Sequence, residues 1–306
     1  MENRNKILVV SPSANIIDDE GSVLMKKAEN FLKINNYVVT YSQGYDKKNR
    51  YTSGTPKRKS QDIMSGFLDK DIDAIISSQG GDNSNDLLEL LDYNKISKCA
   101  KPFFGLSDVT VLLNVIAVKS KITTYHGIDF LWGLGKNATE YTDKLLNGLL
   151  GEGKLEIVKN PNVPKWEIIK EGKGEGIFLG GCLPSFCLLI GTRFDPIEML
   201  NSPFILILED IGQSKSEINS MLTQLKQHEK FSLCRGVVFG SFYFCEQKPK
   251  ENDLPIEEIA KEVFRDKNIP IARIQEIGHC VENIIIPIGS KGKLECENDI
   301  VSLQFC

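Results

Sequence analysis

The sequence predicts an α/β protein, with an N-terminal parallel-sheet α/β domain and a second, C-terminal α/β domain that is rich in strands. Over about the first 130 residues, short apolar runs of strand length alternate with segments of helix length. Strands that alternate with helices form parallel sheets with helices on both faces. A polar, Gly-rich stretch then interrupts the pattern, and a second series of apolar strands follows it.

The N-terminal half supplies four strands and four helices in alternation. We expect strands at 7–10, 37–41, 74–76 and 103–104, and helices near 23–32, 61–68, 85–91 and 109–118. In a parallel sheet of this kind, ligands bind beyond the carboxyl ends of the strands. The residues that follow these apolar runs are therefore the first candidates for a functional site.

The rest of the chain divides into a connection and a second domain. We place the domains at 1–135 and 177–306, with a connecting segment at 136–176 that holds one helix at 141–150. Apolar residues at helical spacing predict two further helices, one near 218–225 and one at 256–263. Strands of the second domain are expected at 204–208, 237–239, 271–274 and 284–286.

Composition excludes several classes of protein. The 306 residues carry a net charge of −4, which does not favour binding to nucleic acid or to an anionic membrane. No apolar run approaches the roughly 20 residues of a membrane span, and the first residues do not resemble a signal peptide, so we expect a cytoplasmic protein. The eight cysteines form no CxxC and the histidines number three, so we expect reduced thiols and no metal site.

The segment Gly105-Leu-Ser-Asp-Val-Thr110 lies between an apolar strand and an apolar helix. A serine at a sharp strand-to-helix turn exposes its hydroxyl at the positive end of the helix, and the amide after it faces a developing oxyanion. Ser107 is therefore a candidate nucleophile. The alternative is a plain helix N-cap, which Ser followed by Asp equally suits.

A second loop, Ser77-Ser-Gln-Gly-Gly-Asp-Asn-Ser-Asn85, also follows a strand. Paired glycines let backbone N–H groups approach a ligand. Gly80 and Gly81 could form an oxyanion hole, or, with Asp82, a phosphate cradle similar to the nucleotide loop of NAD kinases and phosphofructokinases. A tight turn that caps a helix is the third interpretation.

A carboxylate and an imidazole complete the candidates. Glu209 and Asp210 end the apolar strand at 204–208, and His279 follows Gly278 between two apolar runs. His228 is expected to be solvated, and His126 is ambiguous. One hydroxyl, one imidazole, one carboxylate and a Gly-Gly donor loop are what acyl transfer requires.

These motifs resemble the LD-carboxypeptidases, a family of serine peptidases that includes the microcin C self-immunity proteins. The blocks that match, in family order over nearly the whole chain, are 74–93, Lys101-Pro-Phe-Phe-Gly-Leu-Ser-Asp-Val-Thr110, Thr124-Tyr-His-Gly127, Gly180-Gly181, Leu208-Glu-Asp-Ile-Gly212 and Gly278-His279. The resemblance implies that Ser107 is the nucleophile, His279 the general base and Glu209 the residue that orients the imidazole. It also implies oxyanion-hole amides at Gly81 and Asp108, a homodimer, and no metal or other cofactor.

Departures from the family pattern bear on substrate binding. Cys182 stands where the family usually has Asn, Ile128 replaces a common Pro, and Gln213 stands where an acidic residue often follows the Glu-Asp pair. Gln79 replaces an Arg of typical murein enzymes, and the Asp82-Asn-Ser-Asn85 that follows the glycines is similar to the immunity branch. That branch places an aromatic side chain against the nucleobase, and Trp166 is the candidate here, although packing in a loop explains it as well.

The resemblance implies hydrolysis of an amide on the carboxyl side of an amino acid. The substrate is a peptide, such as a murein tetrapeptide that loses D-alanine, or a peptidyl- or aminoacyl-nucleotide, and the sequence does not choose between them. Gly80, Asp82 and Trp166 are the substrate-binding candidates. The alternatives from other classes are an ATP-dependent kinase that uses Gly80-Gly81-Asp82, and a ligand-binding relative without activity.

Overall fold

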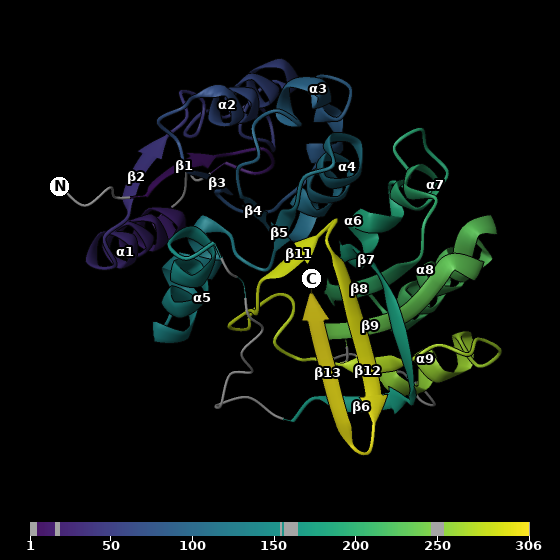
Figure 1. Cartoon of the computed structure of the whole chain (residues 1–306). Helices are drawn as coiled ribbons and strands as arrows, with labels where there is room; N and C mark the ends of the chain where they lie inside the picture. The colour runs from purple at the N-terminus through teal and green to yellow at the C-terminus, as the bar shows by residue number, and fades with distance from the viewer. Residues whose placement is uncertain (1–4, 16–18, 154, 156–164, 246–253, 306) are drawn as a thin grey trace.

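The computed structural model describes residues 5–15, 19–153, 155, 165–245 and 254–305. The fold contains two sheets, and Figure 1 shows the first beneath α2 and α3 and the second beside α8 and α9. The first sheet has six strands in the order β11-β5-β4-β3-β1-β2, all parallel except β11, which is antiparallel to β5. These strands are β1 (Lys6–Val10), β2 (Val38–Tyr41), β3 (Ala74–Ser77), β4 (Phe103–Gly105), β5 (Thr124–His126) and β11 (Ile286–Ile288).

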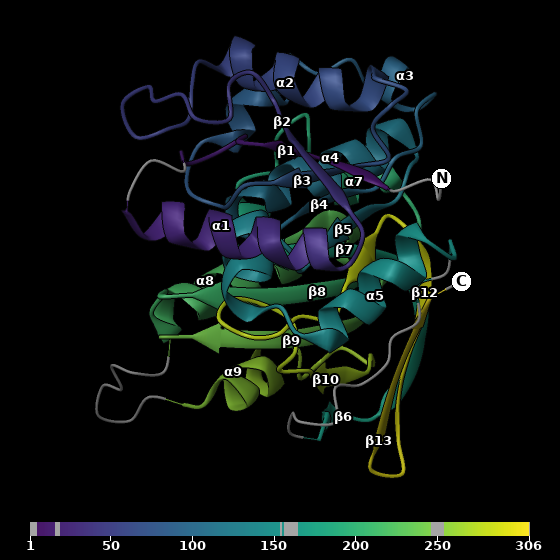
Figure 2. The same ribbon diagram turned by 90° about the vertical axis from the view of Figure 1, so that its left-hand side faces the viewer.

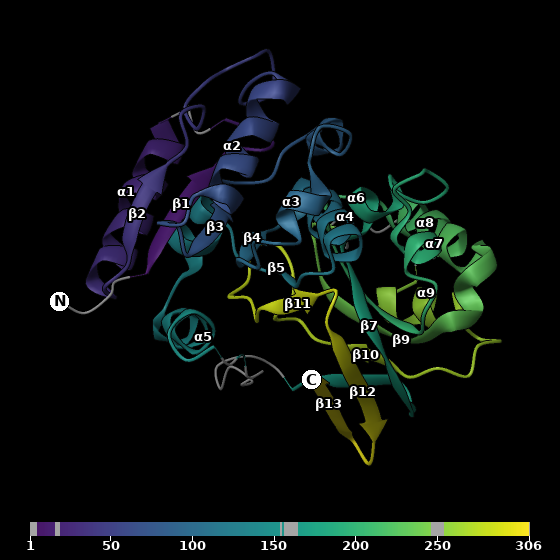
Figure 3. The same ribbon diagram turned by 45° about the horizontal axis from the view of Figure 1, so that its top comes forward.

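Helices cover both faces of this sheet, as the sequence predicted. Alternate residues of β1 point to opposite faces: Ile7 and Val9 pack in one hydrophobic cluster, and Leu8 and Val10 in another. Figures 2 and 3 show α1 and α5 on one face, with α2, α3 and α4 on the other. The helices are α1 (Asp19–Ile34), α2 (Pro56–Leu68), α3 (Tyr93–Ile96), α4 (Thr110–Ser120), the π-helical η3 (Phe130–Asn137) and α5 (Glu140–Leu150).

The second sheet has seven strands in the order β13-β12-β7-β8-β9-β10-β6. Its centre is parallel, whereas β6, β12 and β13 join it in antiparallel pairs. The strands are β6 (Glu167–Lys170), β7 (Gly172–Cys182), β8 (Phe204–Ile211), β9 (Cys234–Tyr243), β10 (Ile271–Arg273), β12 (Lys291–Glu297) and β13 (Ile300–Phe305). The associated helices are α6 (Leu183–Cys187), α7 (Pro196–Leu200), α8 (Lys215–Gln227), η4 (Glu229–Leu233) and α9 (Ile256–Val263).

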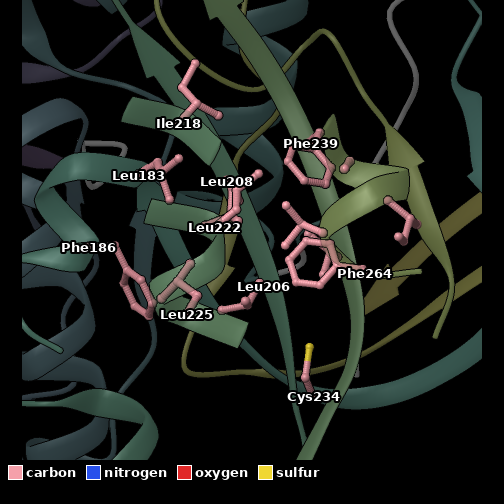
Figure 4. Packing of buried hydrophobic residues seen from close by; sticks show 14 of the residues in the cluster. Leu183, Phe186, Leu206, Leu208, Ile218, Leu222, Leu225, Cys234, Phe239 and Phe264 are labelled. Carbon is pink, nitrogen blue, oxygen red and sulfur yellow. The ribbon is translucent and has the colours of Figure 1, made fainter. Parts of the chain in front are cut away.

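The core of the second sheet positions β8, the strand that ends in Glu209 and Asp210. Figure 4 shows Leu222 and Leu225 of α8 packed against Leu206 and Leu208, with Phe239 of β9 alongside. All five side chains are fully buried. Burial of such side chains contributes about 1.5–3 kcal/mol each, which holds the carboxyl end of β8 firmly in place.

Three expectations about the elements are wrong. The segment 172–176 was expected within a connection, but it begins the long strand β7. A Cβ on Gly174 would lie 1.7 Å from the carbonyl oxygen of Arg235, and one on Gly176 would lie 2.7 Å from the backbone of Phe204. Close approach of neighbouring backbone therefore requires these glycines, and their abundance does not mark a loop. The expected helix at 85–91 is only a 3₁₀ turn, η1 (Ser84–Leu87).

The strand expected at 284–286 forms two residues later, as β11, and it joins the first sheet instead of the second. There it pairs with β5 and covers an edge that would otherwise expose unpaired backbone groups. The C-terminal half therefore completes the sheet of the N-terminal half. Residues 156–164 of the predicted connecting segment lie outside the described residues.

Candidate active site

Ser107 begins the 3₁₀ turn η2 (Ser107–Val109), which follows β4 sharply and continues into α4. Its φ of 63° is unusual for a residue with a side chain, and such backbone strain persists where the surrounding structure enforces it. The turn places Ser107 at the amino end of a helix that is buried over most of its length. The N-cap positions of η2 and α4 are Leu106 and Val109, so Ser107 does not occupy the capping position of either helix.

The Gly80-Gly81 loop follows β3, the strand next to β4 in the sheet. A Cβ on Gly80 would lie 2.8 Å from Oγ of Ser107 and 3.6 Å from the backbone nitrogen of Asp108. Gly81 has a φ of 135°, and a Cβ there would lie 2.6 Å from Cβ of Ala14. Gly80 is therefore needed for the loop to lie directly against the serine turn, and Gly81 for it to lie against the backbone at Ala14.

The Asp108 side chain holds the serine turn to its neighbours. Its Oδ2 accepts hydrogen bonds from Oγ of Ser13 (2.5 Å) and from the backbone N–H of Ser84 (2.9 Å). The hydroxyl of Ser84 donates to the carbonyl oxygen of Asp108 at 2.8 Å. Burial raises the pKa of the Asp108 carboxyl, although the hydrogen bonds from Ser13 and Ser84 oppose the rise. The side chain is thus structural, and the backbone N–H of Asp108 is the group that remains a candidate oxyanion-hole donor.

Glu209 and His279 form a buried pair. Oε2 of Glu209 lies 2.7 Å from Nδ1 of His279, and Glu209 is fully buried. A Cβ on Gly278 would lie 2.9 Å from the same Oε2, so a glycine before His279 lets the loop approach the carboxylate. Burial opposes the ionised form of Glu209, but the charge and hydrogen bonds of His279 prevail and lower its pKa. Burial would lower the pKa of His279, and Glu209 raises it instead.

One cavity of about 570 Å³ brings these groups together. Gly80, Gly81, Ser107 and His279 all line it, and most of its remaining wall is apolar or aromatic. The described contacts include no hydrogen bond between Ser107 and His279, and such contacts are often long before a substrate binds. The other residues that line the cavity include Trp132, Lys136, Tyr243, Phe244, Cys280 and Asn283.

Two predicted substrate-binding residues lie elsewhere. Asp82 does not line the cavity, and its carbonyl oxygen accepts a hydrogen bond from Ser13. Trp166 packs against the core of the second sheet and donates a hydrogen bond to Glu276. Trp132 lines the cavity instead, with its Nε1 3.1 Å from Oε1 of Gln79. Its position right after the Thr-Tyr-His-Gly block could have indicated it.

Cys182 lies at the carboxyl end of β7, opposite Glu209 in the parallel register of β7 and β8. It is buried, and its backbone N–H donates to Oγ1 of Thr110 at 3.0 Å. Burial and the carboxylates of Glu209 and Asp210 raise the pKa of the Cys182 thiol well above its usual range. Asp210 is itself buried, and burial raises its pKa to about 7.

Within the described ranges, no group of three or more His, Cys, Asp or Glu side chains could hold a metal ion. The cysteines of this part of the chain are free thiols. No described helix is both long enough and apolar enough to cross a membrane.

Comparison with protein families gives two matches in series. Residues 7–127 match the LD-carboxypeptidase N-terminal domain, and residues 175–294 match the LD-carboxypeptidase C-terminal domain. Together the two domains span most of the chain, and both the nucleophile candidate and the Glu209–His279 pair lie within them.

Relatives cover nearly all of the chain. The microcin C7 self-immunity protein MccF of Escherichia coli is 26% identical over 89% of this chain and 86% of its own. The murein tetrapeptide carboxypeptidase of Pseudomonas aeruginosa is 24% identical over 95% and 93%. The solved structure of an MccF-like protein from Bacillus anthracis superposes with a TM-score of 0.84 at 26% identity, over 100% of this chain and 97% of that one. These matches give no support to the kinase alternative.

Proposed function

The chain belongs to the LD-carboxypeptidase family, and from this membership we propose that it is a serine carboxypeptidase with Ser107, His279 and Glu209 as its catalytic triad. The observation that carries the proposal is the cavity shared by Ser107, His279 and the Gly80-Gly81 loop, with Glu209 2.7 Å behind the imidazole. A nucleophile, a base, a group that orients the base and backbone donors are the parts that acyl transfer needs.

In the proposed reaction, Oγ of Ser107 attacks the carbonyl carbon of the scissile amide while Nε2 of His279 accepts the hydroxyl proton. The backbone N–H groups of Gly81 and Asp108 stabilise the oxyanion of the tetrahedral intermediate. The imidazolium then returns the proton to the leaving nitrogen, the C–N bond breaks, and an ester to Ser107 remains. Water, deprotonated by His279, hydrolyses that ester and releases the acid.

The electrostatics of the pair suit this role. Because the pKa of Glu209 is lowered by His279 despite burial, the carboxylate stays ionised and stabilises the imidazolium that forms during attack. The pKa of His279 is raised by Glu209 although burial opposes the rise. A base whose pKa lies near the working pH is the most effective proton carrier.

The cavity also indicates what the leaving group carries. Lys136 is the one lysine or arginine that lines the cavity in the described part of the chain, and its ammonium lies 4.6 Å from the centre of the Trp132 ring. The charge of Lys136 also lowers the pKa of Cys280, the neighbour of His279, although burial raises that pKa overall. We assign Lys136 to an anion on the leaving group, because His279 must protonate the leaving nitrogen on this side.

Both candidate substrate classes fit such a site. A terminal D-alanine carries a carboxylate two bonds from the scissile nitrogen, and an aminoacyl-nucleotide amide carries a phosphoryl or sulfamoyl group beside it. The aromatic rings of Tyr243 and Phe244, with centres 4.1 Å apart and planes tilted by 57°, add an apolar wall that suits a nucleobase. The substrate-binding roles of Asp82 and Trp166 stay predictions. A cytoplasmic location and a homodimeric assembly also stay predictions.

The test is product analysis by mass spectrometry with the native protein and Ser107→Ala side by side. The panel contains a murein tetrapeptide, an aspartyl sulfamoyl adenylate and a microcin-type peptide nucleotide. We expect hydrolysis by the native protein alone. Loss of D-alanine identifies a murein carboxypeptidase, and cleavage of the nucleotide amides identifies an immunity-type enzyme. Products that form equally with Ser107→Ala, or no product at all, would overturn the assignment of Ser107.

A further inference from the structure

His126, at the carboxyl end of β5, is a buried imidazole for which the proposed triad has no use. It is fully buried, and neither ring nitrogen has a hydrogen-bond partner among the residues that the structure describes. Its Nε2 lies 3.9 Å from Oε1 of Glu209, which also lacks a partner in this part of the chain. Buried polar groups are nearly always paired. Three unpaired atoms close together, the two ring nitrogens of His126 and Oε1 of Glu209, therefore indicate a functional role.

The surroundings of His126 decide which nitrogen faces Glu209. A Cβ on Gly181 would lie 3.0 Å from Nδ1 of His126 and 2.6 Å from Oγ1 of Thr110. Nδ1 is therefore packed against the backbone of β7, and Nε2 is left toward the carboxylate. Simple packing does not explain the residue, since an apolar side chain would fill the same volume without burying two polar nitrogens.

The contact also joins the two halves of the proposed triad. His126 pairs with Gly105 of β4, two residues before Ser107, in the parallel register of the first sheet. Glu209 belongs to β8 of the second sheet. A fixed contact between His126 and Glu209 therefore sets the position of the carboxylate, and through it His279, relative to the strand that carries the nucleophile.

We propose that His126 is a positioning residue, whose neutral ring directs Nε2–H toward Oε1 of Glu209 and so fixes the carboxylate that orients His279. This role rests on the proposed function for its catalytic meaning, but the interaction itself does not depend on a substrate. The present separation is about 1 Å longer than a charge-assisted hydrogen bond, and catalytic contacts commonly shorten when a substrate binds.

The charge state of His126 is consistent with a neutral donor. Burial lowers its pKa to about 4, against the opposing effect of Glu209 and with the help of His279. The charged groups that act on it are Glu209 from β8 and His279 from the loop after β10. A neutral donor stabilises Glu209 without cancelling its charge, whereas a second cation would compete with His279.

Histidine NMR tests the proposal directly, because the chain has only three histidines. In the native protein labelled with 15N-histidine, we expect His126 to be the neutral Nε2–H tautomer at every pH from about 5.5 to 8. His228, which lies 3.1 Å from Asp195, gives an internal reference far from the triad. A His126 that is cationic in this range, or that carries its proton on Nδ1, overturns the proposal without any substitution.

Two variants extend the test to Glu209. His126→Leu removes the donor, and His126→Gln retains an N–H at a similar distance from the backbone. Without the donor, the Glu209 anion depends more on the positive charge of a protonated His279. The pKa of His279 should therefore rise by about half a unit or more in His126→Leu. In His126→Gln it should stay near the native value. Equal behaviour of the two folded variants contradicts the proposal.

Activity distinguishes this inference from the proposed function. If the native protein yields Ser107-dependent product, kcat should fall about tenfold or more in His126→Leu with little change in KM, and His126→Gln should recover most of it. If no substrate is cleaved but the His279 titration shifts as described, the proposed function fails and the positioning contact stands. If product forms and the titration of His279 is unmoved, the positioning role fails alone.

Discussion

Gly80 and Ser107 lie in direct contact across the carboxyl ends of β3 and β4: a Cβ placed on Gly80 would be 2.4 Å from Cβ of Ser107 and 2.8 Å from its Oγ. Separations this short do not occur between non-bonded carbon atoms. The loop that follows one strand is therefore shaped to the side chain that follows the next. This contact holds the loop beside Ser107, the proposed nucleophile.

The contact predicts a steric cost for Gly80→Ala. The added methyl group must displace Ser107, and overpacking of this kind costs about 1–3 kcal/mol. We expect a lower free energy of unfolding by chemical denaturation and a loss of activity of at least tenfold, because the Ser107 hydroxyl moves from its aligned position. The control is the same substitution in a Ser107→Gly background, where the obstructing side chain is gone. Equal destabilisation in both backgrounds would show that the clash lies elsewhere.

The positive φ of Ser107 (63°) predicts that the residue is strained. Glycine adopts this conformation without the clash that a Cβ creates, a difference of about 1 kcal/mol. Ser107→Gly should therefore be more stable than Ser107→Ala, although both should be inactive. Thermal unfolding of the two variants measures the difference. A Ser107→Ala variant at least as stable as Ser107→Gly would mean that the turn is relaxed.

The raised pKa of His279 predicts the acid limb of the pH–rate profile. In the proposed mechanism His279 is neutral when it accepts the proton of Ser107, so kcat/KM should fall as the pH drops through a value above the ordinary histidine pKa of about 6.5. In Glu209→Gln the anion is gone and the pKa of His279 decreases, so the limb should move to lower pH. The limiting rate should drop about 10²- to 10⁴-fold. An unmoved limb in Glu209→Gln would assign it to another group.

The position of Lys136 in the cavity predicts a preference for anionic over neutral leaving groups. Lys136→Met keeps the length of the side chain and removes its charge. We expect kcat/KM to fall about tenfold for a substrate with a free terminal carboxylate, and to change little for the corresponding amide. Lys136→Arg, which retains the charge, serves as the matched control. A similar loss on both substrates in Lys136→Met would assign Lys136 to structure and not to recognition.

Acid sensitivity follows from His126. Its folded-state pKa of about 4 lies below the unfolded value of 6.5, so the unfolded chain binds a proton first on acidification. Stability contributed by the neutral ring is complete above pH 6.5 and decreases as the pH falls toward 4, by up to about 3 kcal/mol. Denaturation curves at several pH values should therefore show a shallower acid loss in His126→Leu than in the native protein. Parallel curves would mean that His126 is accessible to protons in the fold.

Local pattern was enough to predict much of the fold. The apolar run at 204–208 is the buried core of β8, and the alternation of strands and helices before residue 127 is a parallel sheet with two covered faces. The serine turn and the Gly-Gly loop could be placed at the carboxyl ends of β4 and β3, since position after a strand is a property of the sequence itself. Their roles, like those of Glu209 and His279, came from the resemblance to a family.

Other features depend on residues far apart in the chain. Oε2 of Glu209 and Nδ1 of His279 are 70 residues apart in sequence and 2.7 Å apart in space, and no local pattern predicts that distance. The glycines of β7 suggested a loop because the backbone that they accommodate belongs to distant segments. Trp132 and not Trp166 lines the cavity for the same reason.

Periodicity and strand-end motifs are local, so they were enough to predict the alternation of elements, the family and the loops that hold the candidate site. Three relationships could be seen only in the folded chain: β11 completes the first sheet, Lys136 and Trp132 line the cavity, and His126 lies beside Glu209. Those relationships arise where two sheets meet. Strand pairing and close packing between distant segments set them, and the order of residues along one segment does not encode them.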